Sequence, residues 1–275
     1  MKKQLKNLVV ALFAIIALAL VGCHRNETIT VSDNDLWFSE LSESQTFTIT
    51  SDCSWTIEKN ETANWYTISP TSGEKTNTGT VVTVTVNELE NNNLREASFT
   101  ITSKRGTCTV NMPLTQVAVE FDNILNTVFG VKKVEQWNTD FYGNPIEDTH
   151  FIGRYDPFDT TYGYTMYFLE DSTGVQVDRH KHQTVYYPFQ YAFDAQERNL
   201  YIDFLLEDST HESYNASVLL ACDAMFRLQH EYKPHFWEKI DMAKIGTIDP
   251  GEKSILKKAI SKSKRKGGGP IFNME

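Results

Sequence analysis

Short runs that alternate apolar and polar residues fill the stretch from Ser51 to Gln116, and no other feature constrains the fold of this chain as strongly. In these runs the apolar residues lie two positions apart: Trp55 and Ile57; Val82, Val84 and Val86; Phe99 and Ile101. Successive side chains of a β-strand point to opposite faces, so this spacing predicts strands with one buried and one solvated face. Turn-forming residues separate the runs at 69–73 and 91–93. Several short strands at such spacing predict an antiparallel β-sandwich.

A set of residues runs through this region in a recognisable order: Thr46–Thr50, Trp55, Trp65–Pro70, Gly73, Val84–Asn87, Arg95 and Thr115–Gln116. In this order, residues 28–119 resemble the BACON domain, the Bacteroidetes-associated carbohydrate-binding often N-terminal module. The resemblance implies an immunoglobulin-like β-sandwich on a secreted or cell-envelope protein. The family's name implies carbohydrate binding, but no residue of a glycan site is carried over to this chain.

Residues 1–23 have the organisation of a bacterial signal peptide. Three lysines within the first six residues precede the apolar run Leu8–Val21, which is shorter than the roughly 20 residues of a membrane-spanning helix. The run ends in Leu-Val-Gly-Cys, which resembles a lipobox and implies that Cys23 receives a lipid and becomes the mature N-terminus. Several acyl chains, palmitate among them, anchor a protein stably to a membrane. The alternative is an ordinary signal peptide with a chance cysteine.

The residues after Cys23 bear on location and partners. His24 stands where an aspartate is associated with inner-membrane retention, so the resemblance implies the outer membrane and leaves its periplasmic or cell-surface face open. The whole chain has a formal net charge of −10 at pH 7, although seven of its basic residues follow Glu252. Because an acidic body repels nucleic acid, we exclude nucleic acid as a partner.

Three cysteines remain besides Cys23, in an envelope compartment where disulfide bonds persist. Cys53 and Cys108 both lie in predicted strands of the first domain, whereas Cys222 lies alone in the second. We therefore predict a disulfide bond between Cys53 and Cys108, and a free Cys222. The alternative is that Cys53 and Cys108 are small buried apolar residues.

Residues 120–247 form a second predicted domain. Its first apolar residues, from Phe121 to Phe129, fall on one helical stripe that ends at Gly130, which predicts a short helix. Eight candidate strands follow: Val131–Phe141, His150–Tyr155, Tyr162–Glu170, Gly174–His180, Val185–Asp194, Leu200–Glu207, Ser213–Ala221 and Ala224–Tyr232. Eight consecutive strands joined by short links predict an up-and-down β-barrel.

Five segments of this domain carry a second resemblance: Phe168–Gly174, Phe189–Tyr191, Asn199–Ile202, Tyr214 and Ser217–Leu219. They are similar to the lipocalin-like domains of envelope lipoproteins from the same phylum, which implies an eight-stranded barrel. The Gly-x-Trp motif of true lipocalins does not follow Gly130, since Trp137 is displaced. The resemblance therefore bears on the barrel more than on a ligand-holding calyx.

Ten aromatic residues crowd the second domain: Tyr162, Tyr164, Phe168, Tyr186, Tyr187, Phe189, Tyr191, Phe193, Tyr201 and Phe204. Small barrels are filled by their own side chains, so the first interpretation is a barrel core. The alternative is an aromatic face that binds sugar rings or a small apolar ligand, because such side chains join a flat apolar body to a polar tip.

No motif indicates catalysis, a cofactor or a metal. The chain lacks a Gly-x-Ser-x-Gly elbow, a phosphate-binding glycine loop and a dinucleotide fingerprint. His230 and His235 are five residues apart with Pro234 between them, unlike the i, i+4 pair of a zinc peptidase. We interpret His180 and His182 as exposed histidines, and we predict a protein that is not an enzyme.

Residues 248–275 form a basic tail. Asp249–Glu252 has the pattern of a helix start, with a capping aspartate before a proline, and Gly267 is a natural end. Between them lie four apolar residues on one stripe among lysines: Ile255, Leu256, Ala259 and Ile260. This predicts a basic amphipathic helix that docks on the acidic body, contacts anionic lipid headgroups, or stays frayed in solvent.

Two functions of different classes follow from these features. In the first, the protein is a lipid-anchored envelope lipoprotein that binds a glycan or a small ligand through its β domains. In the second, it is a structural spacer or a partner-docking component of an outer-membrane assembly, and neither domain binds a small molecule. Neither the ligand nor a protein partner is identified by the sequence.

Overall fold

The structure is a computed structural model, and it describes residues 27–60, 62–90, 94–181, 183–205 and 210–263. Contacts divide the chain into two compact units. The first unit contains residues 44–87 and 96–114 together with the chain up to Leu36. The second contains Trp37–Glu43, Glu88–Arg95 and the chain from Thr115 onward. The predicted signal peptide, with Cys23, lies outside the described residues.

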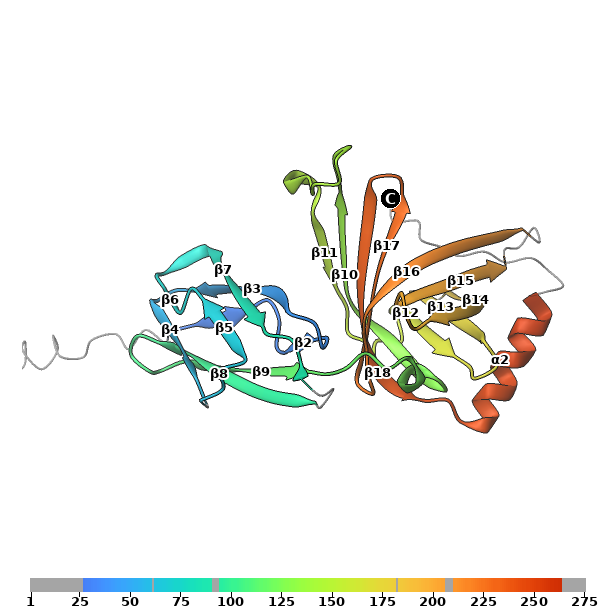
Figure 1. Cartoon of the computed structure of the whole chain (residues 1–275), viewed down its shortest axis with the longest axis horizontal. Helices are drawn as coiled ribbons and strands as arrows, with labels where there is room; N and C mark the ends of the chain where they lie inside the picture. The colour runs from blue at the N-terminus through green and yellow to red at the C-terminus, as the bar shows by residue number, and fades with distance from the viewer. Residues whose placement is uncertain (1–26, 61, 91–93, 182, 206–209, 264–275) are drawn as a thin grey trace, which may run out of the picture. The chain divides into compact units, whose positions relative to one another are not determined.

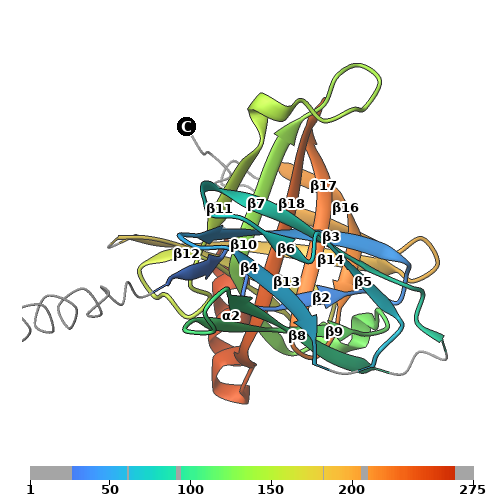
Figure 2. The ribbon, with the colours of Figure 1, turned by 90° about the vertical axis from the view of Figure 1, so that its left-hand side faces the viewer.

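Nine strands form the first domain: β1 (Ile29–Val31), β2 (Leu36–Phe38), β3 (Glu43–Ser51), β4 (Trp55–Lys59), β5 (Tyr66–Ser69), β6 (Ser72–Gly73), β7 (Thr76–Val86), β8 (Arg95–Ser103) and β9 (Thr109–Gln116). They pair in two sheets, in the orders β1-β3-β7-β5 and β2-β9-β8-β4-β6. Figure 2 shows β3 and β7 crossing above β8 and β9. All the alternating residues that predicted strands are buried, which confirms the immunoglobulin-like β-sandwich.

The second domain begins with the 3₁₀ helix η2 (Phe121–Ile124) and contains nine strands and the short 3₁₀ helix η3 (Glu147–Thr149). The strands are β10 (Thr127–Asn138), β11 (Phe151–Arg154), β12 (Tyr162–Phe168), β13 (Thr173–His180), β14 (Gln183–Asp194), β15 (Asn199–Leu205), β16 (His211–Ala221), β17 (Met225–Lys233) and β18 (Phe236–Thr247). β10 pairs with both β12 and β18, so β10 and β12–β18 close an antiparallel barrel of eight strands (Figure 1). The predicted barrel is confirmed.

Two of the predicted elements differ from the structure. The predicted strand at His150–Tyr155 is β11. It pairs with residues 133–136 of β10 and takes no part in closing the barrel. The eighth barrel strand is β18, which the sequence interpretation missed. The expected helix to Phe129 ends at Ile124, because β10 starts at Thr127. Gly130 lies within β10, where a Cβ atom would collide with the carbonyl oxygen of Pro157.

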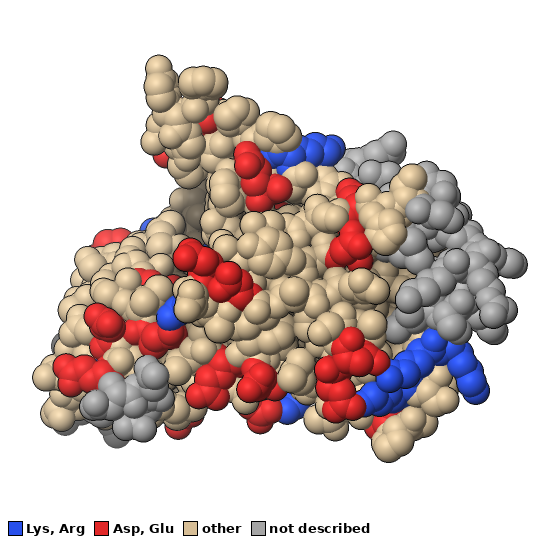
Figure 3. Space-filling model, turned by 45° about the vertical axis from the view of Figure 1, so that its right-hand side comes forward, with Lys and Arg blue, Asp and Glu red and all other residues tan. Residues whose placement is uncertain are grey.

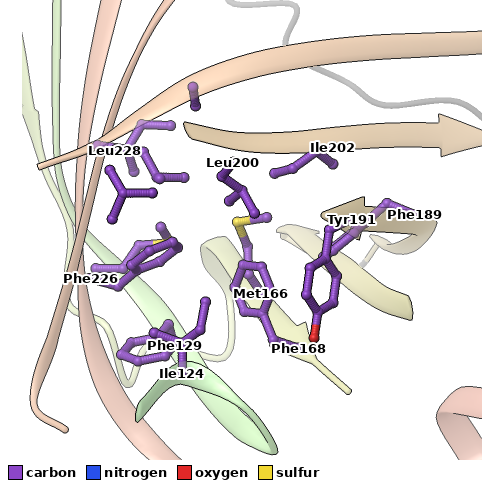
Figure 4. Close-up of a cluster of buried hydrophobic side chains, with 14 of the residues drawn as sticks. Ile124, Phe129, Met166, Phe168, Phe189, Tyr191, Leu200, Ile202, Phe226 and Leu228 are labelled. Atoms are coloured by element: carbon purple, nitrogen blue, oxygen red, sulfur yellow. The ribbon is translucent and has the colours of Figure 1, made fainter. Parts of the chain in front are cut away.

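The lower half of the barrel interior is an apolar cluster of fully packed side chains. Phe168 contacts the rings of Phe189, Tyr191 and Phe226 at centroid distances of 5.6, 5.3 and 5.4 Å. Figure 4 shows these rings converging with Met166, Leu200 and Ile202 from several strands. Half of the ten aromatic residues singled out in the sequence belong to this core: Phe168, Tyr187, Phe189, Tyr191 and Phe204. For these five residues the core interpretation is correct.

Helix α2 (Pro250–Ser263) follows the barrel and begins where the sequence predicted. An oxygen of the Asp249 side chain accepts the Glu252 backbone N–H at 2.8 Å, which is the expected cap. Leu256 is buried in the apolar cluster that contains Tyr167 and Val175 on the outside of the barrel. Ile255 is 65% exposed, so it is not part of the buried face that the sequence predicted. None of the helices in the described part of the chain is long and apolar enough to span a membrane.

The lysines of α2 pair with acidic residues of the barrel. Lys253 contacts Glu170, and the Lys257 ammonium lies 2.6 Å from an Asp171 carboxylate oxygen. Figure 3 shows basic side chains at the lower right, directly beside acidic ones. The described part of the helix therefore docks on the acidic body. The remaining predicted tail, including Gly267, lies outside the described residues.

Candidate functional site

A small cavity lies inside the barrel, in the part around Gln176 and His230 that we call the upper half of the interior. Six of its lining residues also belong to the apolar cluster, so the two parts of the interior are continuous. The cavity has a volume of about 30 Å³ and is lined by ten residues: Tyr164, Met166, Gln176, Ile202, Phe204, Tyr214, Ala216, Leu228, His230 and Ile240. They come from six strands, because alternate side chains of every barrel strand point inward. The volume is enough for one or two water molecules. The barrel is therefore closed but not completely filled.

Gln176 contributes a buried hydrogen-bond acceptor to this cavity. It lies on β13 and is 1% exposed. Its Nε2 donates to Asp178 Oδ1 at 2.8 Å, and the orientation of the amide follows from that contact, because an ionised carboxylate only accepts. The amide oxygen consequently faces away from Asp178. It has no hydrogen-bond partner among the described residues.

His230 contributes a second buried polar atom from β17, where it is 6% exposed. Its Nε2 lies 3.1 Å from Glu238 Oε1, and the other oxygen of Glu238 accepts from Gln136 Nε2 at 2.6 Å. With Nε2–H donated to the carboxylate, the neutral imidazole has its lone pair on Nδ1. Within the described chain, Nδ1 has no partner. The cavity thus presents two acceptors that the protein itself leaves unused.

Burial sets the protonation of the groups around the cavity. Loss of hydration raises the pKa of Asp178 to about 6, against the Gln176 hydrogen bond and the charge of Arg179, which lower it. Burial also raises the pKa of the Tyr214 hydroxyl well above its usual range, and the Glu212 carboxylate adds to this. For Tyr164, burial again acts first and the charge of Glu238 second. Both tyrosines therefore keep their protons at physiological pH.

The exposed aromatic residues do not form a comparable site. Tyr162, Tyr186 and Tyr201 are 44%, 48% and 46% exposed. They lie on β12, β14 and β15 at separate register positions, and Tyr201 pairs with Ala192 while Tyr186 pairs with Val177. Of the ten aromatic residues named in the sequence, Tyr164 and Phe204 line the cavity, whereas these three tyrosines lie at separate positions on the surface.

The predicted disulfide bond is not present, because Cys53, Cys108 and Cys222 are all free thiols. Cys53 precedes β4 and Cys108 precedes β9, and β8 lies between these two strands. The Cys53 sulfur contacts the Ser51 hydroxyl at 3.2 Å, and the Cys108 backbone N–H donates to the Ser103 hydroxyl at 3.0 Å. Burial raises the pKa of the Cys222 thiol.

The sequence interpretation named no ligand-binding residue and missed the polar pair that lines the cavity. Gln176 stands between Val175 and Val177, so alternation alone assigns the two valines to the core and Gln176 to the solvated face. Those valines in fact pack outside the barrel with Leu256 of α2. In the sequence, His230 was considered only together with His235, as a possible pair of metal ligands. An available signal was its spacing from Phe226 and Leu228, which share its strand face.

Comparisons with known proteins bear on the first domain. Residues 54–117 match the BACON family, described as "Putative binding domain, N-terminal", which confirms the resemblance seen in the sequence. A Bacteroides ovatus GH5 xyloglucanase in complex with a XXXG heptasaccharide is similar at 23% identity and a TM-score of 0.30, over 34% of this chain and 20% of that one. WR4, a C. elegans MSP family member, is similar at 9% identity and a TM-score of 0.26, over 33% of this chain and 97% of that one.

This chain therefore spans about a fifth of the length of the xyloglucanase that it resembles. No curated protein matches the chain. The resemblance of the second domain to lipocalin-like domains stays a prediction.

Proposed function

We propose that this protein is a lipid-anchored envelope lipoprotein that acts by binding, and that its barrel holds a small ligand. One observation carries the proposal: Gln176 Oε1 and His230 Nδ1 are buried beside one cavity with no partner among the described residues. Leaving a buried polar atom unsatisfied costs roughly 1–3 kcal/mol, so two at one place favour an external partner. A closed barrel that served only as a spacer would have no use for them.

Glycan binding by the first domain is the second part of the proposal. The observation that favours it is the match of residues 54–117 to a family described as a binding domain. Our test uses the mature chain without its lipid, beginning at His24, on a glycan array and with a fluorescent apolar probe. A glycan signal supports the first domain, and probe binding that is lost in Phe204→Trp, which fills the cavity, supports the barrel. Silence in both assays would leave the spacer function.

The anchor is tested separately. We propose that Cys23 carries the lipid and holds the protein on the outer membrane, because the residues before it resemble a lipobox. The expected result is that wild type incorporates labelled palmitate and sediments with membranes, while Cys23→Ala does neither. A Cys23→Ala protein that still carries label and sediments would overturn the anchor without affecting the binding proposal.

A further inference from the structure

The two unused acceptors of the barrel cavity are held in place by acidic residues. Asp178 fixes the amide of Gln176, and Glu238 fixes the imidazole of His230. In each case the nitrogen that carries a proton faces the carboxylate, so the acceptor atom faces elsewhere. Both acceptors belong to residues that line the same cavity. A ligand that satisfies these two atoms must supply hydrogen-bond donors to them.

The charges around the cavity further restrict the ligand. None of the ten described residues that line it is Lys or Arg. The nearby cation Arg179 donates to the Thr165 hydroxyl at 3.0 Å. Two carboxylates, Asp178 and Glu238, thus stand directly behind the two acceptors. Hydrogen bonds from a charged donor are roughly twice as strong as neutral ones, and a buried negative field increases the preference for a cation.

We propose that the barrel cavity binds a primary amine, as its ammonium ion, carried on a slender apolar body. The ammonium has three N–H donors, enough to serve both Gln176 Oε1 and His230 Nδ1. A ligand whose polar end is a carboxylate or a phosphate is excluded, since it would bring acceptors and negative charge to a site that already has both. This inference rests on the proposed function of the barrel and names the chemical class of its ligand.

The remaining lining residues agree with this assignment. Ile202, Leu228 and Ile240 are buried and offer only aliphatic surface. Tyr164 and Tyr214 are the lining residues that are partly exposed, and the other eight are buried. Because the cavity measures only about 30 Å³, it accommodates a compact head group with no more than a short aliphatic group.

The test compares three probes small enough for the cavity that differ in the head group: methylamine, methanol and acetate. Binding to the full mature chain is followed by protein NMR at pH 8, where an alkylamine is protonated. We expect methylamine to bind about tenfold more tightly than methanol, since a charge-assisted hydrogen bond replaces a neutral one. We expect no binding of acetate.

Two matched variants locate the effect. Gln176→Met removes the buried acceptor, whereas Gln190→Met makes the same change at an exposed position of β14. Amine binding that falls about tenfold in Gln176→Met and is unchanged in Gln190→Met supports the proposal. Equal binding of amine and alcohol, or tighter binding of acetate, overturns the amine inference and leaves the proposed function standing. If none of the three probes binds, the inference and the barrel as a small-ligand site both fail.

Discussion

The lower and upper halves of the barrel interior are built from the same alternating strands but obey different rules. In the lower half, rings such as Phe168 and Phe226 are 0% exposed and meet only apolar neighbours. In the upper half, Gln176, His230 and Glu238 are just as inaccessible, and two of their polar atoms lack partners in the described chain. Interiors built only for stability satisfy or avoid buried polar groups. The contrast supports our proposal that the upper half holds a ligand.

The largest effect that we expect comes from the lower half. Phe226 contacts Phe129 and Phe168 at centroid distances of 5.6 and 5.4 Å, so Phe226→Ala leaves a large gap among rigid rings. The free energy of unfolding is expected to fall by about 3–5 kcal/mol in urea denaturation. Phe158→Ala, at a position that is 66% exposed, is the control and should change it by less than about 0.5 kcal/mol. A loss below about 1 kcal/mol for Phe226→Ala would remove the distinction between the halves.

The next effect concerns charge in the upper half. Because burial raises the pKa of Asp178 to about 6 in the folded protein, the native state keeps a proton that the unfolded state loses near pH 4. The native state therefore binds more protons between these values, so stability falls as pH rises from about 4 to about 6 and this contribution is constant above. We expect Asp178 to account for a loss of about 2 kcal/mol, discounted for its partial exposure.

Urea denaturation of wild type and Asp178→Asn from pH 4 to pH 8 checks this expectation. The variant cannot ionise at this position. The free energy of unfolding of wild type should therefore fall relative to that of the variant as pH rises. Asp203→Asn, at an acidic residue of β15, is the comparison variant. A wild-type minus Asp178→Asn difference that stays constant with pH would show that Asp178 is effectively solvated.

Strand periodicity predicted most of the fold, and it failed where a polar residue occupies an inward position. The barrel follows from the alternation, as in Leu200, Ile202 and Phe204. The predicted number of eight strands was reached by counting β11, which lies outside the barrel, in place of β18. β18 was missed because Glu238 interrupts the inward row that Ile240 and Met242 continue. The strand order that closes the barrel depends on long-range pairing between β10 and β18, which no local pattern encodes.

The same limitation hid the candidate site. A buried glutamine or histidine looks like a surface residue in a sequence, because polar side chains are mostly exposed. Gln176 therefore appeared to lie on the solvated face of its strand, and only the docking of Leu256 on the opposite face corrects this. Polar residues that line the cavity thus interrupt the alternation of apolar and polar residues from which the rest of the strand is predicted.

The smallest effect on stability is expected at the residue that we consider most important for binding. Gln176→Met removes the amide that donates to the Asp178 carboxylate, which costs about 1.5–3 kcal/mol because the acceptor is charged. It also removes the buried oxygen that has no partner among the described residues, which returns about 1–3 kcal/mol. Methionine has a similar length and fills irregular interior space. The free energy of unfolding at pH 7 should therefore change by less than about 1 kcal/mol, or rise slightly.

Urea denaturation of Gln176→Met beside Gln190→Met measures this difference against an exposed glutamine on the same barrel. A loss above about 2 kcal/mol would mean that Gln176 supports the fold as Phe226 does. The two halves of the interior would then differ only in composition. Near-neutral stability combined with lost amine binding would separate them by role, since methionine keeps the packing volume of the glutamine and removes only its amide group.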